Sequence, residues 1–150
     1  MLTVSTSLAR GEGEDVSGPA LVELCERAGL EVVHETVPDD RGEIAAALRR
    51  FADDDGVRFV FTTGGTGLTP DDVTPEATLD VIEREAPGYA ESIRADSRPH
   101  TPLGILTRGI SGVRGRTLIV NFPGNPKAIA QSWPVVEPTL KHAAETLERD

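Results

Sequence analysis

Short β-prone segments alternate with amphipathic helical segments along the chain, and this alternation limits the folds that it can adopt. The segment 57–62, Val-Arg-Phe-Val-Phe-Thr, is the most apolar of the β-prone segments. Strands that are covered by helices on both faces have this composition. Alternating strands and helices build a mainly parallel sheet with helices on both sides. We therefore expect an α/β protein, a three-layer α/β/α sandwich with a mainly parallel central sheet.

Glycine and proline residues mark the boundaries of the expected elements. A helical face that runs from Leu21 to Ala28 is followed by Gly29, which can end a helix in the left-handed conformation. Asp15 or Ser17 is expected to cap the start of this helix. Further helices are predicted at 42–52, 75–85, 89–96 and after 126. Pro134 and Pro138 are expected to break or kink the last of these helices. Strands are predicted at 2–6, 31–37, 57–62, 103–106 and 116–121.

The composition excludes several classes of protein. A chain of 150 residues that is 38% hydrophobic and 27% charged is expected to form one domain over residues 1–150. Its net charge of −10 argues against a sequence-independent nucleic-acid binder. We also expect no membrane span, because no apolar run approaches roughly 20 residues. No signal peptide is expected, because the N-terminal residues lack a basic region and an apolar stretch. Cys25 is the only cysteine, so no disulfide is expected and the cytosol (a cytoplasmic location) is the expected compartment.

A segment rich in glycine and threonine directly follows the apolar strand expected at 57–62. It reads Thr-Gly-Gly-Thr-Gly at 63–67, and ligands of open α/β sheets lie beyond the carboxyl ends of strands. Closely spaced glycines allow backbone N–H groups to approach an anion. The segment therefore predicts a phosphate-binding loop, with hydroxyl donors added by threonines; its residues are Thr63, Gly64, Gly65, Thr66, Gly67 and Thr74.

Two carboxylates follow the glycines in the same loop. Asp71 and Asp72 would repel a phosphate unless a cation lay between them, so the combination implies magnesium. The alternative is a strand-to-helix turn in which Asp72 or Thr74 caps the next helix. The loop is not a Walker sequence, because no lysine follows the glycines.

A second loop lies before the C-terminal helix and reads Pro123-Gly124-Asn125-Pro126-Lys127. Two prolines around Gly-Asn indicate a rigid turn. Lys127 falls in the first turn of the following helix, where a cation is unfavourable for the helix dipole. A nearby anion would explain this lysine, and a tight turn with a solvated lysine is the alternative.

The run 63–67, continued by Asp-Val-Thr-Pro-Glu-Ala-Thr at 72–78, resembles the signature of the molybdopterin adenylyltransferase family of Mog and MoaB type. The G domains of plant Cnx proteins and of gephyrin represent the same family. Three further segments are similar to it in the same order: 11–19 to its first loop, 37–40 (Val-Pro-Asp-Asp) to its acidic turn, and 112–128 to its closing segment. The resemblance covers nearly the whole chain.

The resemblance implies the activity as well as the fold. A molybdopterin adenylyltransferase is a nucleotidyltransferase of molybdenum cofactor biosynthesis that transfers AMP from ATP to the phosphate of molybdopterin and releases pyrophosphate. The resemblance further implies Mg2+ as the cofactor, ATP and molybdopterin as the substrates, and a homo-oligomer, a homotrimer or a hexamer. It leaves open a contact with the enzyme that later inserts the metal. No nucleic acid and no membrane are expected as partners.

Motif matching carries the family's roles onto particular residues. It implies Asp72 as the catalytic carboxylate that places magnesium, and Asp39 as the acidic residue on the pterin side. It implies phosphate or substrate contacts for Ser17, Gly18 and Gly64 to Gly67, and a nucleotide-side wall made by Pro123, Gly124, Asn125 and Lys127.

One departure from the family pattern lies in the first loop. Many members carry an aspartate where this chain has Thr6. If that aspartate holds magnesium or orients substrate, this protein would be slower; alternatively Ser5, Thr6 or Ser7 supplies a hydroxyl ligand. The competing hypothesis is a non-catalytic oligomer that stores molybdopterin or hands it on, since function depends on the site and not on the fold.

Overall fold

A six-stranded mixed sheet forms the centre of the computed structural model, which describes residues 1–149. The strand order is β2-β1-β3-β6-β5-β4. The first four of these strands are parallel, and β5 runs antiparallel to both of its neighbours. The predicted α/β fold with a mainly parallel sheet is therefore confirmed. The strands are β1 (Leu2–Val4), β2 (Glu35–Val37), β3 (Phe59–Thr63), β4 (Arg84–Glu85), β5 (Ser111–Arg114) and β6 (Thr117–Phe122).

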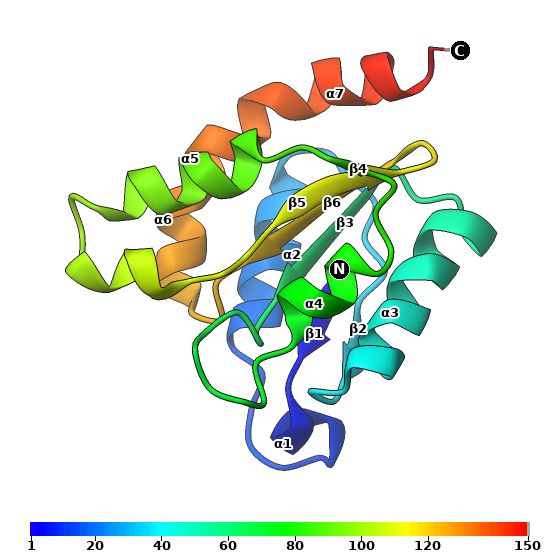
Figure 1. The fold of residues 1–150 in the computed structure, drawn as a ribbon. Coiled ribbons are helices and arrows are strands. Elements are labelled where there is room, and N and C mark those ends of the chain that lie inside the picture. The colour runs from blue at the N-terminus through cyan, green and yellow to red at the C-terminus, as the bar shows by residue number, and fades with distance from the viewer. Residues whose placement is uncertain (150) are drawn as a thin grey trace.

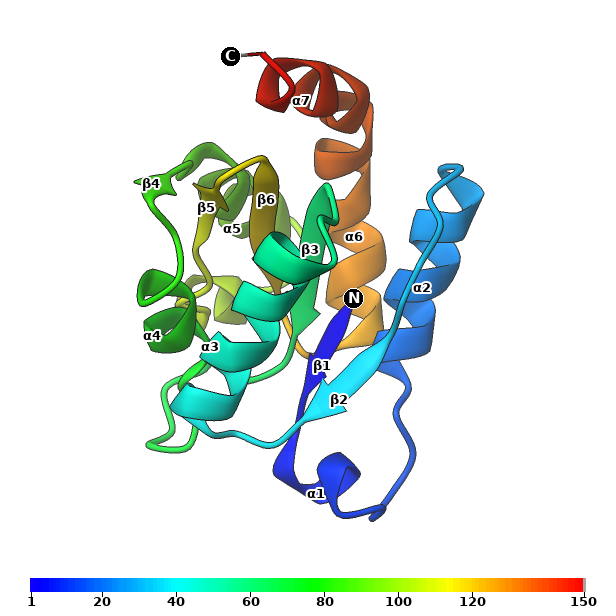
Figure 2. The ribbon, with the colours of Figure 1, turned by 90° about the vertical axis from the view of Figure 1, so that its right-hand side faces the viewer.

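Helices cover both faces of this sheet, which gives the three layers seen in Figures 1 and 2. Helices α2, α5 and α6 pack on one face, and α3 and α4 pack on the other. The short α1 lies beyond the end of β1. The helices are α1 (Thr6–Ala9), α2 (Ser17–Arg27), α3 (Arg41–Arg49), α4 (Thr74–Leu79), α5 (Gly88–Ser97), α6 (Pro126–Val136) and α7 (Leu140–Leu147).

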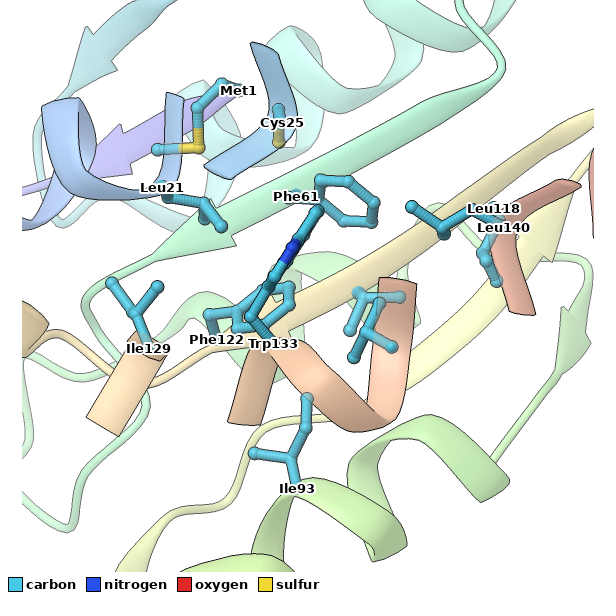
Figure 3. Packing of buried hydrophobic residues seen from close by; sticks show 12 residues of the cluster. Met1, Leu21, Cys25, Phe61, Ile93, Leu118, Phe122, Ile129, Trp133 and Leu140 are labelled. Atoms are coloured by element: carbon cyan, nitrogen blue, oxygen red, sulfur yellow. The ribbon is translucent and has the colours of Figure 1, made fainter. Parts of the chain in front are cut away.

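The alternation of side chains along the central strands creates two separate cores. In β3, Phe61 faces the α2–α6 side and Val60 faces the α3–α4 side, as a strand's period of two residues requires. Phe61 lies edge-on to Phe122 of β6 and to Trp133 of α6, with ring centroids 5.6 and 5.8 Å away (Figure 3). These edge-to-face contacts fix α6, and with it the turn at 123–125, against the sheet.

Two of the predicted elements are wrong. Residues 103–106 are not a strand, because Pro102–Leu106 forms a 3-10 helix whose start is capped by the Thr101 hydroxyl. Pro102 supplies the fixed φ of a first helical turn. The helix predicted at 75–85 ends at Leu79 as α4, and β4 follows it. Backbone groups of 83–86 pair with the free edge of β5, which outweighs the local helix propensity.

Other strands and helices begin or end at residues that differ from the predicted ones, because of contacts with distant segments. The strands predicted at 2–6 and 31–37 are paired only over Leu2–Val4 and Glu35–Val37, because β1 offers three residues as partners. The connection at 109–115 contains β5, which turns into β6 through Gly115 with a φ of 54°. The C-terminal helix continues through Pro134 and is interrupted at Glu137–Thr139, where Pro138 lies.

Within residues 1–149, no helix has the length and the apolar character that crossing a bilayer requires.

A buried amide on β6 ties the sheet to α4. The Asn121 side chain donates to the hydroxyls of Thr62 and Thr78 at 3.0 and 3.1 Å and accepts from the Ile110 backbone N–H at 3.1 Å. Asn121→Ala should lower the free energy of unfolding by about 2–3 kcal/mol, because it leaves buried polar groups without partners. Urea denaturation measures this, with Thr62→Val as the control that removes only one of the contacts. An equal loss for both variants would contradict the prediction.

Candidate functional site

The carboxyl ends of β1, β3 and β6 meet at one edge of the sheet, and their following loops lie against each other. Thr63, the last residue of β3, donates its hydroxyl proton to the carbonyl of Pro123 after β6 at 2.8 Å. A Cβ placed on Gly124 would come within 3.2 Å of the Gly64 Cα. The structure therefore brings the two predicted loops, 63–67 and 123–127, together into one site.

Two glycines of the glycine loop at 63–67 have backbone conformations that other residues rarely adopt. The φ angles of Gly64 and Gly65 are 97° and 68°. A Cβ on Gly64 would lie 2.3 Å from the carbonyl oxygen of Val4, and one on Gly65 would lie 2.3 Å from the hydroxyl oxygen of Thr74. Both the conformation and the close approach of neighbours require glycine here. The alternative in which Asp72 or Thr74 caps the next helix is wrong, because the N-cap residue of α4 is Val73 and it makes no side-chain cap hydrogen bond; that the glycines hold an anion stays a prediction.

The threonines of the loop mainly hold its shape. Thr74 is fully buried; its hydroxyl donates to the Gly64 carbonyl at 2.9 Å, and its backbone N–H donates to the Gly65 carbonyl at 3.0 Å. The hydroxyl protons of Thr63 and Thr74 are thus engaged inside the protein. Thr66 is buried and accepts a hydrogen bond from Thr107 at 3.1 Å, and among the residues that the structure describes its own hydroxyl proton has no acceptor. Backbone N–H groups and Thr66 are the donors that this loop can offer.

Asp72 lies directly against the glycine loop. Its Oδ2 accepts hydrogen bonds from the backbone N–H and the hydroxyl of Thr69 at 3.0 and 2.8 Å. The same oxygen would lie 2.8 Å from a Cβ on Gly67, so the absence of a side chain there makes room for the carboxylate. Within residues 1–149, Oδ1 accepts no hydrogen bond. One oxygen of Asp72 therefore orients the side chain and the other is open to a ligand.

Arg108, which no sequence pattern had indicated, holds the glycine loop through several contacts. Its guanidinium donates to the carbonyls of Gly67 and Asp72 at 2.8 and 2.6 Å and forms an ion pair with Glu76. Its backbone N–H donates to the Thr66 carbonyl at 2.8 Å. Since these partners lie 32–42 positions away in sequence, no local pattern at Arg108 could have indicated the role.

The Arg108 guanidinium holds the pKa of the Glu76 carboxyl below its ordinary value, chiefly through their hydrogen bond. A carboxyl whose pKa is lower in the folded than in the unfolded protein stabilises the fold at pH values above its unfolded-state pKa, about 4.3. This stabilisation is lost as the pH falls through the lower folded-state pKa. Glu76→Gln should therefore be less stable than the parent at pH 7, and the difference should shrink as the pH falls below about 4. Thermal melts across this pH range measure it. In an Arg108→Gln background the Glu76 substitution should lose this pH dependence; its persistence there would contradict the assignment.

Asp39, predicted on the pterin side, lies at the same edge of the sheet and pairs with Thr6. Its Oδ2 accepts from both the backbone N–H and the hydroxyl of Thr6, at 2.8 and 3.0 Å, and its own backbone N–H donates to the Thr6 hydroxyl at 3.0 Å. These reciprocal bonds join the end of β1 to the segment after β2. Thr6 thus contributes to the site by orienting Asp39.

The loop at 11–19, which leads into α2, is held by its own contacts. Asp15 accepts from the Gly18 backbone N–H and from the Thr3 hydroxyl, both at 2.9 Å, and His34 lies 2.8 Å from the same hydroxyl. Asp15, and not Ser17, therefore accepts the hydrogen bond of a backbone N–H group in the first turn of α2. Among the described residues, Gly18 is thus held by Asp15 and makes no hydrogen bond with the glycine loop.

The Pro123–Lys127 turn leads into α6 as the prolines predicted. Asn125 caps α6, its Oδ1 accepting from the Ala128 backbone N–H at 3.1 Å. Lys127 lies exposed in the first turn of α6. An exposed cation therefore stands at the rim of the edge where the two loops meet.

Comparisons with known proteins identify the family of this chain. Residues 1–142 match the family described as "Probable molybdopterin binding domain". The chain is 37% identical over 152 residues to the molybdenum cofactor synthesis protein cinnamon of Drosophila melanogaster, and it covers 25% of that longer protein. It is 35% identical over 150 residues to the molybdopterin adenylyltransferase of Helicobacter pylori (strain ATCC 700392 / 26695), covering 98% of this chain and 85% of that one.

Solved structures show the same fold. The molybdopterin biosynthesis enzyme MoaB of Thermus thermophilus superposes with a TM-score of 0.90 at 45% identity, covering 97% of this chain and 92% of that one.

Proposed function

This chain belongs to the molybdopterin adenylyltransferase family of Mog and MoaB type, and from that premise we propose that it transfers the adenylyl group of ATP to molybdopterin. The observation that carries the proposal is the rigid glycine loop at the carboxyl edge of the sheet, with Asp72 seated against Gly67 and the loop tied to the Pro123 turn. A phosphate cradle beside an open carboxylate oxygen suits the joining of two phosphorylated substrates.

The reaction needs no side-chain nucleophile. An oxygen of the molybdopterin phosphate, already anionic at neutral pH, attacks the α-phosphorus of ATP. The new P–O bond forms as the bond from the α-phosphorus to the bridging oxygen breaks, and its electron pair leaves with pyrophosphate. The task of the protein is to position and neutralise two polyanions. The backbone N–H groups of 64–67 and the hydroxyl of Thr66 donate to phosphate oxygens, and Lys127 adds a positive charge at the rim.

The residues present fit a magnesium ion that is held mainly by substrate. Asp72 offers Oδ1, and Gly67 leaves the space beside the carboxylate open. Within the described residues no three His, Cys, Asp or Glu side chains gather as a metal site, so phosphate oxygens and water would complete the coordination, as is usual for Mg2+. When bound, magnesium supplies charge neutralisation between carboxylate and phosphate. Asp39, oriented by Thr6, would face the pterin substrate.

Adenylyl transfer is tested by pyrophosphate release. The purified protein with ATP, magnesium and molybdopterin should release pyrophosphate, and omission of either substrate should abolish the release. Binding of molybdopterin without any pyrophosphate would replace this proposal by the non-catalytic one, in which the protein stores or hands on the pterin.

The affinity for ATP should depend steeply on magnesium. A carboxylate and a phosphate charge about 4 Å apart repel by several kcal/mol at an effective dielectric near 20, and a bridging cation reverses the sign. Molybdopterin carries one phosphate, so its binding should depend on magnesium less. Calorimetric titrations of each ligand in magnesium and in EDTA measure this. Equal ATP affinity in both buffers would mean that Asp72 does not hold a metal.

A cytosolic homo-oligomer, a trimer or a hexamer, also belongs to the proposal. Light scattering coupled to size exclusion measures the assembly directly. A monomer at micromolar concentration would contradict it.

A further inference from the structure

A cavity of about 210 Å3 lies at the amino ends of β1 and β3, whereas the candidate site lies at their carboxyl ends. Its walls come from the start of β1, from α2, from the residues after α3 and from the segments 30–33 and 57–61. The volume is several times the roughly 30 Å3 that one water molecule occupies in the liquid. The cavity is therefore large enough for part of a polypeptide.

The chain on either side of β1 continues past the first residue of that strand. β1 pairs with β2 in the register Leu2↔Glu35 and with β3 in the register Leu2↔Thr62. When both registers are extended backwards, residues 31–33 and residues 58–60 come to face the same rungs of the sheet, just beyond Met1. In Figure 2 the segment that leads into β2 and the strand β3 both extend past the point marked N. The cavity occupies the gap between them.

Backbone groups line both sides of this gap. Phe59 and Val60 are paired with β6 and not with β1. Within residues 1–149, the backbone N–H groups of 31–34 donate no hydrogen bond. The ladder still continues at Met1, whose carbonyl accepts from the Glu35 N–H at 3.1 Å and whose nitrogen donates to the Val33 carbonyl at 2.8 Å. Open strand edges of this kind are templates for a further strand.

The cavity walls are apolar on both faces of the sheet. Cys25 and Phe59 pack in the core on the α2–α6 side, and Phe51 and Val57 pack in the core on the α3–α4 side. Cys25 is seen beside Met1 in Figure 3. An occupant in line with β1 would contact apolar side chains on two opposite sides. A β-strand can do so, because its successive side chains point to opposite faces.

The charged residues of the wall do not favour a small ion. Glu31 and Arg58 line the cavity with opposite charges, and Arg58 is already paired with Glu148 at 2.8 Å. The Nη1 group of Arg58 is buried and has no acceptor among the described residues. A backbone carbonyl entering beside Arg58 would supply an acceptor without adding a charge.

We propose that this gap is a strand site, which accepts an extended apolar peptide segment that runs parallel to β3 in line with β1. The segment would pair with 31–33 on one side and with 58–60 on the other, in the mode of β-strand addition. Its side chains would alternate between the Phe51 side and the Cys25 side. The inference does not depend on the proposed function, because the gap and the candidate site lie at opposite ends of the strands.

A peptide segment tethered to the full chain tests the proposal. Serine followed by three valines, joined to the nitrogen of Met1, has a high effective concentration at the gap. It should raise the melting temperature by about 5 °C or more. It should also slow amide hydrogen exchange at Val33 at least about 10-fold, because the Val33 carbonyl already faces β1 and the N–H of a strand residue points the same way. The N–H of His34 points the other way and should be unaffected.

Two segments of equal length provide the controls. Ser-Gly-Ser-Gly lacks apolar side chains, and Ser-Val-Pro-Val stays apolar but loses a ladder donor. Neither should raise the melting temperature or protect Val33 as the valine segment does. A valine segment that changes neither quantity, or an equal rise in melting temperature with all three segments, would overturn the proposal. So would an equal rise with the proline segment, since that result would indicate apolar covering without strand pairing.

Discussion

Asp72→Asn should lower the rate of adenylyl transfer at least about 10-fold, which corresponds to about 1.4 kcal/mol of lost transition-state stabilisation. The amide can still accept the two hydrogen bonds from Thr69, which Oδ2 of the carboxylate accepts in the parent. The turn should therefore keep its shape, and circular dichroism and the melting temperature should change little. What the variant loses is the negative charge beside the glycine loop. Pyrophosphate release at saturating magnesium measures the effect.

The neighbouring carboxylate provides the control. Asp71 is exposed, and Asp71→Asn removes the same charge one position away. It should lower the rate less than Asp72→Asn does. Asp72→Asn should also flatten the dependence of ATP binding on magnesium, because one charge that the cation must neutralise is gone. Near-parental turnover of the Asp72 variant would remove Asp72 from the catalytic site.

Gly65→Val should lower the affinity for both phosphate ligands, ATP and molybdopterin, at least 10-fold. A β-branched residue is strained at a φ of 68°, and its Cβ would lie 2.3 Å from the hydroxyl that Thr74 uses to hold the Gly64 carbonyl. The backbone N–H groups of the loop would then lose their common orientation. Calorimetry with each ligand measures the loss.

Gly56 offers a matched control for conformational strain. Its φ is 61°, close to that of Gly65, but a Cβ there meets no atom within 4 Å. Gly56→Val should therefore destabilise the fold by strain alone, on the order of 1–3 kcal/mol, and leave ligand affinity unchanged. Parental ligand affinity in Gly65→Val would show that the glycine loop is not the phosphate cradle.

Features whose causes lie within a few residues of each other could be predicted from the sequence. The alternation of strands and helices, the apolar β3, and the turn into α6 at Asn125 were all predicted from local patterns. The glycines at 64, 65 and 67 also indicated the cradle, since closely spaced glycines are needed only where backbone must turn or approach closely. Their positive φ angles and crowded surroundings confirm that requirement for Gly64 and Gly65.

Features whose partners are far apart in the chain could be identified only from the three-dimensional fold. Thr6 meets Asp39 across 33 positions, Arg108 meets Gly67 across 41, and Thr63 meets Pro123 across 60. The same holds for β4, which local propensity assigned to a helix and which the edge of β5 holds as a strand. Hydrogen bonds and packing of this kind depend on which segments the sheet brings together, and no window of neighbouring residues contains that information.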